Sequence, residues 1–109
     1  MIMAMYENVF LFSGNLTEKK ANEKIDSVEE LIKKNKGNVL KKEYWGLRSL
    51  AYKIKKNSKA HYFMLNTENN YETIIEIKKK LSIDDDYLRL LNLKITEFDK
   101  NPSIISKSK

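Results

Sequence analysis

Cationic side chains gather in one stretch of the chain, Lys41–Lys59, and their spacing points to phosphate binding. The stretch carries seven basic residues and one acidic residue, Glu43, a balance of +6 that equals the net charge of all 109 residues. A positive field confined to one segment attracts a polyanion and orients it on arrival. We therefore predict a nucleic-acid-binding surface here. Its basic residues are Lys41, Lys42, Arg48, Lys53, Lys55, Lys56 and Lys59.

The residue types in this stretch suggest how each cation would act. Arg48 and Arg89 are the only arginines of the chain, so they are the candidates for bidentate contacts with a phosphate or a carboxylate. Lysines make point-charge contacts and carry no sequence information. The alternative is that the lysines only keep an exposed hairpin soluble. Segregation of the whole net charge into one segment favours binding.

Other residues that could support catalysis or metal binding lack the partner side chains that such sites need. The chain has no cysteine, which excludes disulfides and thiolate chemistry. His61 is the only histidine, and no nucleophile or acid motif accompanies it, so we expect a hydrogen-bonded strand residue near the sheet edge. Asp84, Asp85 and Asp86 are consecutive and cannot converge on one metal ion, so we expect a solvated turn. We predict no enzyme activity, no cofactor and no metal.

Length and composition indicate one globular domain. With 41% hydrophobic and 33% charged residues, 109 residues support a single core. We assign residues 1–98 to this domain and residues 99–109 to a short flexible tail. The apolar start has no basic region before it, and no stretch approaches the roughly 18 apolar residues of a membrane span. We expect a protein without a membrane partner.

The first half of the chain predicts a strand, a helix and a long strand. Residues 6–12 are short, aromatic and β-branched, and a turn at 13–15 follows. Thr17 is a plausible N-cap, and Gly37 ends the helix that it starts. The apolar residues of that helix recur every three or four positions at Ala21, Ile25, Val28 and Ile32. Residues 39–54 then read as one strand, with Gly46 at a bulge or bend.

The second half of the chain predicts a hairpin connection, a returning strand, a second helix and a last strand. We predict a hairpin connection over residues 55–60 with Asn57 and Ser58 at its tip, and a returning strand over residues 61–67. A helix capped near Asn69 and Asn70 follows, and its buried face comprises Ile74, Ile77 and Leu81. Residues 87–96 form the last strand.

The order β-α-β-β-α-β indicates an α+β protein with the ferredoxin-like split βαβ arrangement. Four antiparallel strands would form one sheet with both helices on one face, and the other face would stay open for a partner. This fold serves enzymes, ligand-binding domains and RNA binders, so it decides no function by itself.

Several runs resemble the bacterial small-subunit ribosomal protein six family. The middle of the chain is similar to that family in Tyr44–Tyr52, Ile54–Asn57 and Lys59–Tyr62, and the flanks in Tyr6–Glu7 and Tyr87–Arg89. The resemblance covers residues 5–98, and the family's fold is the one expected above. Lys53 stands where many members carry proline, which keeps a strand amide and adds a charge to the hairpin.

The resemblance implies a structural protein of the small ribosomal subunit in a bacterial-type cytoplasm or organelle. Such a protein binds the central domain of the small-subunit ribosomal RNA together with ribosomal protein eighteen, and takes no small-molecule substrate. We expect Lys53, Lys55, Lys56 and Lys59 to approach phosphates. The rival is an acylphosphatase-like enzyme or ligand-binding domain on the same fold, and residues 13–16 offer neither the arginine nor the glycine-rich loop that it needs.

Overall fold

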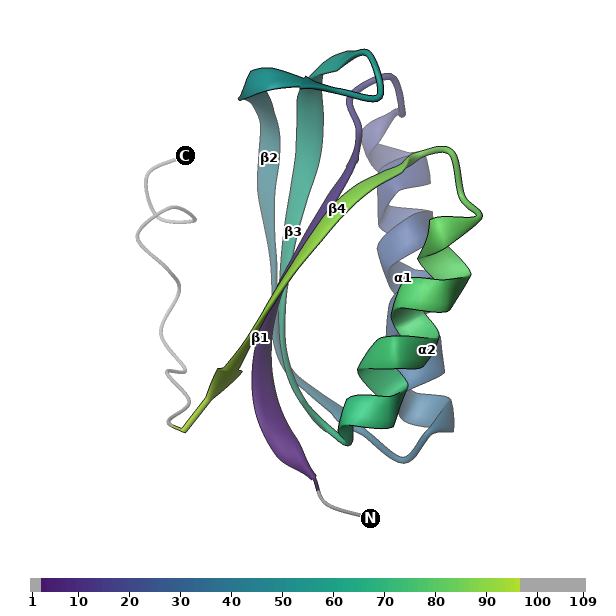
Figure 1. Cartoon of the computed structure of the whole chain (residues 1–109), viewed down its shortest axis with the longest axis vertical. Helices are drawn as coiled ribbons and strands as arrows, with labels where there is room; N and C mark the ends of the chain where they lie inside the picture. The colour runs from purple at the N-terminus through teal and green to yellow at the C-terminus, as the bar shows by residue number, and fades with distance from the viewer. Residues whose placement is uncertain (1–2, 97–109) are drawn as a thin grey trace.

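The computed structural model describes residues 3–96, and the elements follow the predicted order (Figure 1). The boundary of the predicted tail at residue 99 lies outside these residues. The strands and helices are β1 (Ala4–Ser13), α1 (Glu18–Lys34), β2 (Asn38–Ile54), β3 (Asn57–Asn69), α2 (Tyr71–Ser82) and β4 (Tyr87–Ile95).

All four strands belong to one sheet in the order β2-β3-β1-β4, and every neighbouring pair is antiparallel. Both helices cover the same side of this sheet (Figure 1). The ferredoxin-like α+β fold predicted from the sequence is therefore confirmed. The order places β1 and β3 inside the sheet and leaves β2 and β4 as its edges.

The predicted caps start both helices. The Thr17 side chain accepts a hydrogen bond from the Lys20 amide at 3.2 Å, and the Asn70 side chain accepts one from the Thr73 amide at 2.8 Å. Each cap satisfies an amide that the first helical turn leaves without an intrahelical acceptor. At the other end of α1, the Gly37 amide donates to the Ile32 carbonyl at 2.9 Å and closes the helix.

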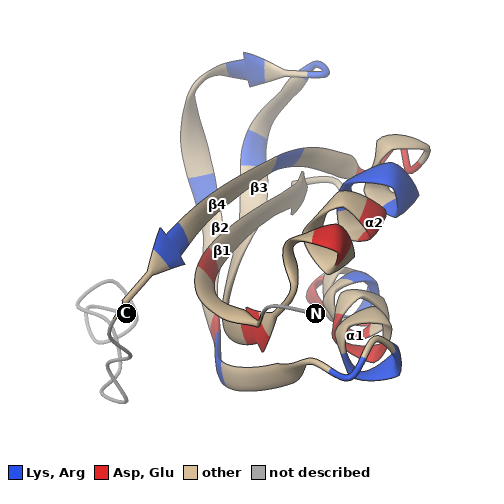
Figure 2. Cartoon of the chain, turned by 60° about the horizontal axis from the view of Figure 1, so that its bottom comes forward, with Lys and Arg blue, Asp and Glu red and all other residues tan. Residues whose placement is uncertain are grey.

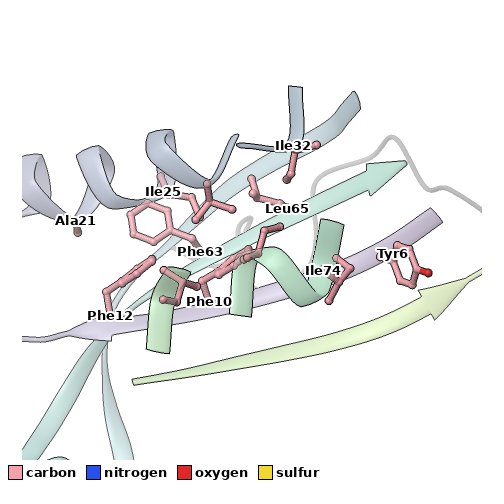
Figure 3. Close-up of a cluster of buried hydrophobic side chains, with 12 residues drawn as sticks. Tyr6, Phe10, Phe12, Ala21, Ile25, Ile32, Phe63, Leu65 and Ile74 are labelled. Atoms are coloured by element: carbon pink, nitrogen blue, oxygen red, sulfur yellow. The ribbon is translucent and has the colours of Figure 1, made fainter. Parts of the chain in front are cut away.

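The core fills the space between the helices and the inner strands (Figure 3). Phe10 and Phe12 of β1 and Phe63 of β3 are fully buried, and the Phe12 and Phe63 rings meet edge to face with centroids 6.1 Å apart. The helix residues predicted to face the sheet are all buried: Ala21, Ile25, Val28, Ile32, Ile74, Ile77 and Leu81. The 3.6-residue periodicity thus identified both buried faces correctly.

A relay of hydrogen bonds between buried side chains runs from β1 through β3 to the start of α2. Asn8 of β1 donates to the Thr67 hydroxyl at 3.1 Å, and that hydroxyl donates to the Asn69 side-chain oxygen at 2.6 Å. Asn69 then donates to the carbonyl of Asn70, which caps α2. Because these buried polar groups have partners, they fix the position of α2 instead of opposing folding.

The hairpin between β2 and β3 differs from the prediction. Ile54 pairs with Asn57, so the turn contains only Lys55 and Lys56, which have φ angles of 48° and 68°. Positive φ at both central residues is the signature of a type I′ turn. The expected tip at Asn57 and Ser58 was wrong, because Asn57 begins β3 and its side chain donates to the carbonyls of Ile54 and Lys55.

The open face of the sheet, opposite the helices, is partly covered by the chain itself. The β2–β3 register shifts between Tyr44 and Gly46, which confirms the bulge predicted at Gly46, and again between Ser49 and Ile54. Leu50, within the second shift, and Ile54, at its end, pack on a small buried cluster of Leu11, Ala60 and Leu88. The sequence predicts that this whole face is open to a partner, but part of it is covered by the end of β2, because a bulged strand bends.

The acidic turn before β4 is tied to α1. The Lys24 amino group lies 2.7 Å from an Asp84 carboxylate oxygen and 3.3 Å from one of Asp86. The hydrogen bonds and charges of these carboxylates raise the pKa of Lys24 against the opposing effect of burial. Burial alone would raise the pKa of Asp84, but the hydrogen bond and charge of Lys24 hold it below its ordinary value of 3.8.

Removing buried volume from α2 tests the packing. Ile77→Ala should lower the free energy of unfolding by about 2–4 kcal/mol, because the truncated side chain leaves a cavity against the sheet. Ile75, on the same helix but 41% exposed, is the matched control, and Ile75→Ala should cost less than about 0.5 kcal/mol. Denaturant melts that give the two variants equal losses would contradict the assignment of faces.

The Lys24–Asp84 contact predicts a pH window of stability. Lys24→Met should lower the free energy of unfolding by about 0.2–1 kcal/mol near pH 7. Because the pKa of Asp84 is lower in the folded state, its ionised carboxylate stabilises the fold above pH 3.8. This stabilisation is lost as the pH falls through the lower pKa of the folded state. The difference between the variant and the native chain should therefore disappear in acid melts. Lys19→Met, an exposed change on the same helix, should show no such pH dependence.

Candidate nucleic-acid interface

The end of the β2–β3 hairpin, residues 50–59, is the positive pole of the molecule. No acidic residue occurs between Glu43 and Glu68, so residues 44–67 of the hairpin carry positive charge alone. Figure 2 shows this end projecting away from the helices, with basic and no acidic segments along it. The helices, by contrast, mix both signs (Figure 2). A phosphate approaching the hairpin end would meet no repelling carboxylate on it.

Three of the predicted lysines present unengaged amino groups at this end. Lys53, Lys56 and Lys59 are exposed. Within residues 3–96, no hydrogen bond or ion pair engages their amino groups. A solvated amino group can take a phosphate without breaking a protein contact, so these three are the strongest candidates for RNA contacts.

Lys55 differs from the other hairpin lysines. Its amino group donates to the Tyr87 carbonyl at 2.8 Å and lies 5.8 Å from the centre of the Tyr87 ring. A carbonyl acceptor and an aromatic face both stabilise an ammonium ion. These contacts therefore tie the hairpin turn to the start of β4, on the opposite edge of the sheet.

Both arginines also make contacts within the fold. Arg48 donates through Nε to the Trp45 carbonyl at 2.9 Å, within the bulged part of β2. Arg89 of β4 donates to the Tyr52 hydroxyl at 3.0 Å and lies 5.7 Å from the centre of that ring. The Arg89 contact joins the two edge strands of the sheet, β2 and β4.

The two lysines at the start of the basic segment lie away from the hairpin end. Lys42 contacts Asp26 at 3.0 Å and Glu29 at 2.9 Å on α1, which places its charge on the helix side of the sheet. Burial would lower the pKa of Lys42, but these carboxylates raise it overall. Lys41 is half-buried and pairs with Asn66, in the part of β3 that lies far from the hairpin turn. The structure therefore separates Lys41 and Lys42 from the other candidates.

Two aromatic residues of the hairpin, Tyr44 and Phe63, are not available for stacking with bases. Tyr44 and Phe63 pack against each other with ring centres 4.8 Å apart, and Phe63 is fully buried. Burial raises the pKa of the Tyr44 hydroxyl, with a smaller effect from the Glu18 charge. Single-strand binders stack bases on exposed rings. Of the hairpin rings, Tyr52 is 61% exposed, and Arg89 contacts it.

His61 has a structural role on an inner strand. Its Nε2 lies 2.7 Å from the Leu16 carbonyl, which can only accept a hydrogen bond, so Nε2 donates. In the neutral ring Nδ1 then accepts from the Tyr44 hydroxyl at 2.8 Å. The hydrogen-bonded role was predicted, but the position near a sheet edge was wrong, because β3 lies between β2 and β1.

Two residues that support the hairpin were missed by sequence reasoning. Asn57 accepts a hydrogen bond from the Ser13 hydroxyl at 2.7 Å, which joins the hairpin to the turn after β1. Gly14 in that turn lies so close to β3 that a Cβ atom would come within 2.5 Å of the Lys59 carbonyl oxygen. The Ser13-Gly14-Asn15 run signals a turn, but nothing in it names the segment that the turn touches.

Other site types find no support in residues 3–96. No group of three His, Asp or Glu side chains there could hold a metal ion. No helix in that range is long and apolar enough to cross a membrane. The turn after β1 contains one glycine and no arginine, as the sequence shows.

Comparisons with known proteins agree on one family. The family model described as Ribosomal protein S6 matches residues 5–94. Small ribosomal subunit protein bS6 of Gluconobacter oxydans is 39% identical over 94% of this chain and 64% of its own length. The same protein of Gluconacetobacter diazotrophicus is 41% identical over 98% of this chain and 66% of its own length. The chain thus spans just under two thirds of these relatives.

A solved structure matches the fold. The crystal structure of 30S ribosomal protein S6 from Thermotoga maritima superposes with a TM-score of 0.79 at 22% identity, over 86% of this chain and 89% of that one. The arrangement of strands and helices described above is therefore found in a protein of that name. Together with the match over residues 5–94, these findings show that the chain belongs to the ribosomal protein S6 family.

Proposed function

We propose that this chain is a structural component of the small ribosomal subunit that binds the central domain of the small-subunit ribosomal RNA together with ribosomal protein eighteen. Membership in the ribosomal protein S6 family supports the structural role. The observation that carries RNA binding is the acid-free hairpin end, where Lys53, Lys56 and Lys59 present unengaged amino groups among the described residues.

The mechanism is electrostatic docking without bond-making chemistry. Lysines that meet phosphates release condensed counterions, which drives association and makes it depend on salt. Such contacts position the protein but read no bases. Specificity then comes from the shape of the folded RNA and from the partner protein that completes the surface. No cofactor, metal or small-molecule substrate takes part, and the proposed place of action is the ribosome of a bacterial-type cytoplasm or an organelle.

We assign the contact with ribosomal protein eighteen to the uncovered part of the open face. Leu91 and Leu93 of the edge strand β4 are 53% and 62% exposed, next to Val9 and Glu7 of β1. Adjacent exposed leucines on one sheet face are typical of protein interfaces. We further propose that the tail from residue 99, which lies outside the described residues, becomes ordered when the partner binds.

The enzymatic alternative has less support. An acylphosphatase-like site needs an arginine in a phosphate-binding loop, and the turn after β1 instead packs against the hairpin through Gly14. Arg48 and Arg89 bind a carbonyl and a tyrosine hydroxyl elsewhere. Family membership also favours the structural interpretation.

Neutralising the hairpin tests the RNA contact. Replacing Lys53, Lys55, Lys56 and Lys59 with glutamine should weaken assembly with a central-domain RNA fragment and protein eighteen strongly. The plot of log affinity against log salt should flatten by about 0.9 for each phosphate that is no longer neutralised, taking duplex RNA to behave like B-form DNA. Thermal stability should change little, because exposed lysines contribute little to folding.

A matched variant separates specific contacts from general charge. Replacing Lys19, Lys33, Lys34 and Lys36 on and after α1 with glutamine removes the same charge from another surface. This control should keep most of the salt slope. Equal losses in both variants would show that net charge alone drives binding, and an unchanged hairpin variant would place the RNA surface elsewhere.

The leucines of β4 test the partner surface. Leu91→Ser combined with Leu93→Ser should weaken binding of protein eighteen by about tenfold or more, because a tenfold loss needs only about 1.4 kcal/mol from the two side chains together and central interface residues can cost about 2 kcal/mol each. Calorimetric titration would measure this affinity. Ile83→Ser is the control, since Ile83 is 86% exposed in the turn after α2. An unaltered affinity of the double variant would reject the open face as the contact.

A further inference from the structure

The hairpin turn adopts a backbone conformation that its two residues disfavour. Lys55 and Lys56 have φ angles of 48° and 68°. Side chains with a Cβ atom crowd the backbone in this left-handed region, and type I′ turns prefer Asn-Gly for that reason. Strained residues of this kind persist only where their surroundings hold them.

The Asn57 side chain stabilises the turn through hydrogen bonds. Its side-chain nitrogen donates to the carbonyls of Ile54 at 3.3 Å and Lys55 at 3.1 Å, so one amide closes the turn. Its oxygen accepts from the Ser13 hydroxyl at 2.7 Å. The Gly14 amide also donates to the Lys59 carbonyl at 3.1 Å, and the Asn15 side chain donates to the Asn57 oxygen at 3.5 Å. Three hydrogen bonds therefore join the turn after β1 to the end of the hairpin.

The Lys55 side chain attaches the turn to β4. Its amino group reaches the Tyr87 carbonyl at 2.8 Å, on the first residue of β4. Arg89, two residues further on, reaches the Tyr52 hydroxyl at 3.0 Å. The hairpin end is therefore attached to both flanking elements of the fold, although it contributes no residue between Trp45 and Lys59 to the main core among residues 3–96.

We propose that Asn57 and Lys55 are positioning residues of the RNA-binding hairpin. They hold the left-handed turn so that Lys53, Lys56 and Lys59 meet phosphates as a preformed set. Groups that are already ordered lose less conformational entropy on binding, which increases affinity without adding a contact. This inference rests on the proposed RNA binding and divides the four hairpin lysines into one that positions and three that bind.

The two lysines of the turn provide a matched pair for the test. Lys56→Met should lower affinity for the central-domain RNA fragment with protein eighteen, and flatten the salt slope by about 0.9, because one phosphate is no longer neutralised. Lys55→Met removes the same charge one residue earlier. It should weaken binding by about three- to tenfold and keep the salt slope of the native chain. A slope reduced equally in both variants would overturn the positioning role of Lys55.

Asn57→Ala tests the turn without changing any charge. Backbone ¹⁵N relaxation of the free protein should show the Lys55 and Lys56 amides more mobile on the ps–ns timescale, and RNA affinity should fall with an unchanged salt slope. Ser58→Ala, on the exposed neighbour, should alter neither. An Asn57 variant whose turn stays rigid, or whose turn loosens while RNA affinity stays the same, would overturn the inference.

These outcomes distinguish the inference from the proposed function. If replacing Lys53, Lys56 and Lys59 together leaves RNA affinity and salt slope unchanged, RNA binding at this hairpin fails, and the positioning role fails with it. If that triple replacement abolishes binding while Lys55→Met and Asn57→Ala bind as tightly as the native chain, the hairpin binds RNA and only the positioning role is rejected.

Discussion

The mismatch in length between β2 and the helices governs how the rest of the molecule is stabilised. α1 and β2 both contain 17 residues, but a helix rises about 1.5 Å per residue and a strand about 3.3 Å. The helices therefore cover only part of the hairpin that β2 begins, and its last residues must be stabilised without the main core. The small cluster around Leu11, Ala60 and Leu88 and the contacts of Asn57, Lys55 and Arg89 supply that support.

The main core and the proposed RNA contact consequently lie in different parts of the molecule. The buried phenylalanines and the Asn8–Thr67–Asn69 relay fix the sheet and α2, and they lie away from the positive hairpin end. A surface outside the core can accumulate like charge at little cost to folding, because its lysines remain solvated. In this chain the whole net charge of +6 is matched by the segment that contains that end.

The fold also sorts residues of one type into different roles. Lys24 and Lys42 neutralise carboxylates of the domain itself, and Lys55 anchors a turn. Lys53, Lys56 and Lys59 make no such contact among the described residues. A lysine adjacent in sequence to a proposed RNA-binding lysine can thus be structural, because a tight turn sends neighbouring side chains in different directions. Counting basic residues in a segment therefore overestimates the number available to a phosphate backbone.

Local sequence patterns were sufficient to predict the element order, both buried helix faces, the caps at Thr17 and Asn70, the bulge at Gly46 and the segment of positive charge. These features depend on periodicity, capping and composition, which neighbouring residues encode. The tertiary fold, in contrast, places the turn at Lys55–Lys56, makes β3 an inner strand, and joins the hairpin to the turn after β1 through Asn57 and Gly14. Those outcomes depend on strand register and on contacts between segments distant in the sequence, which no local pattern records.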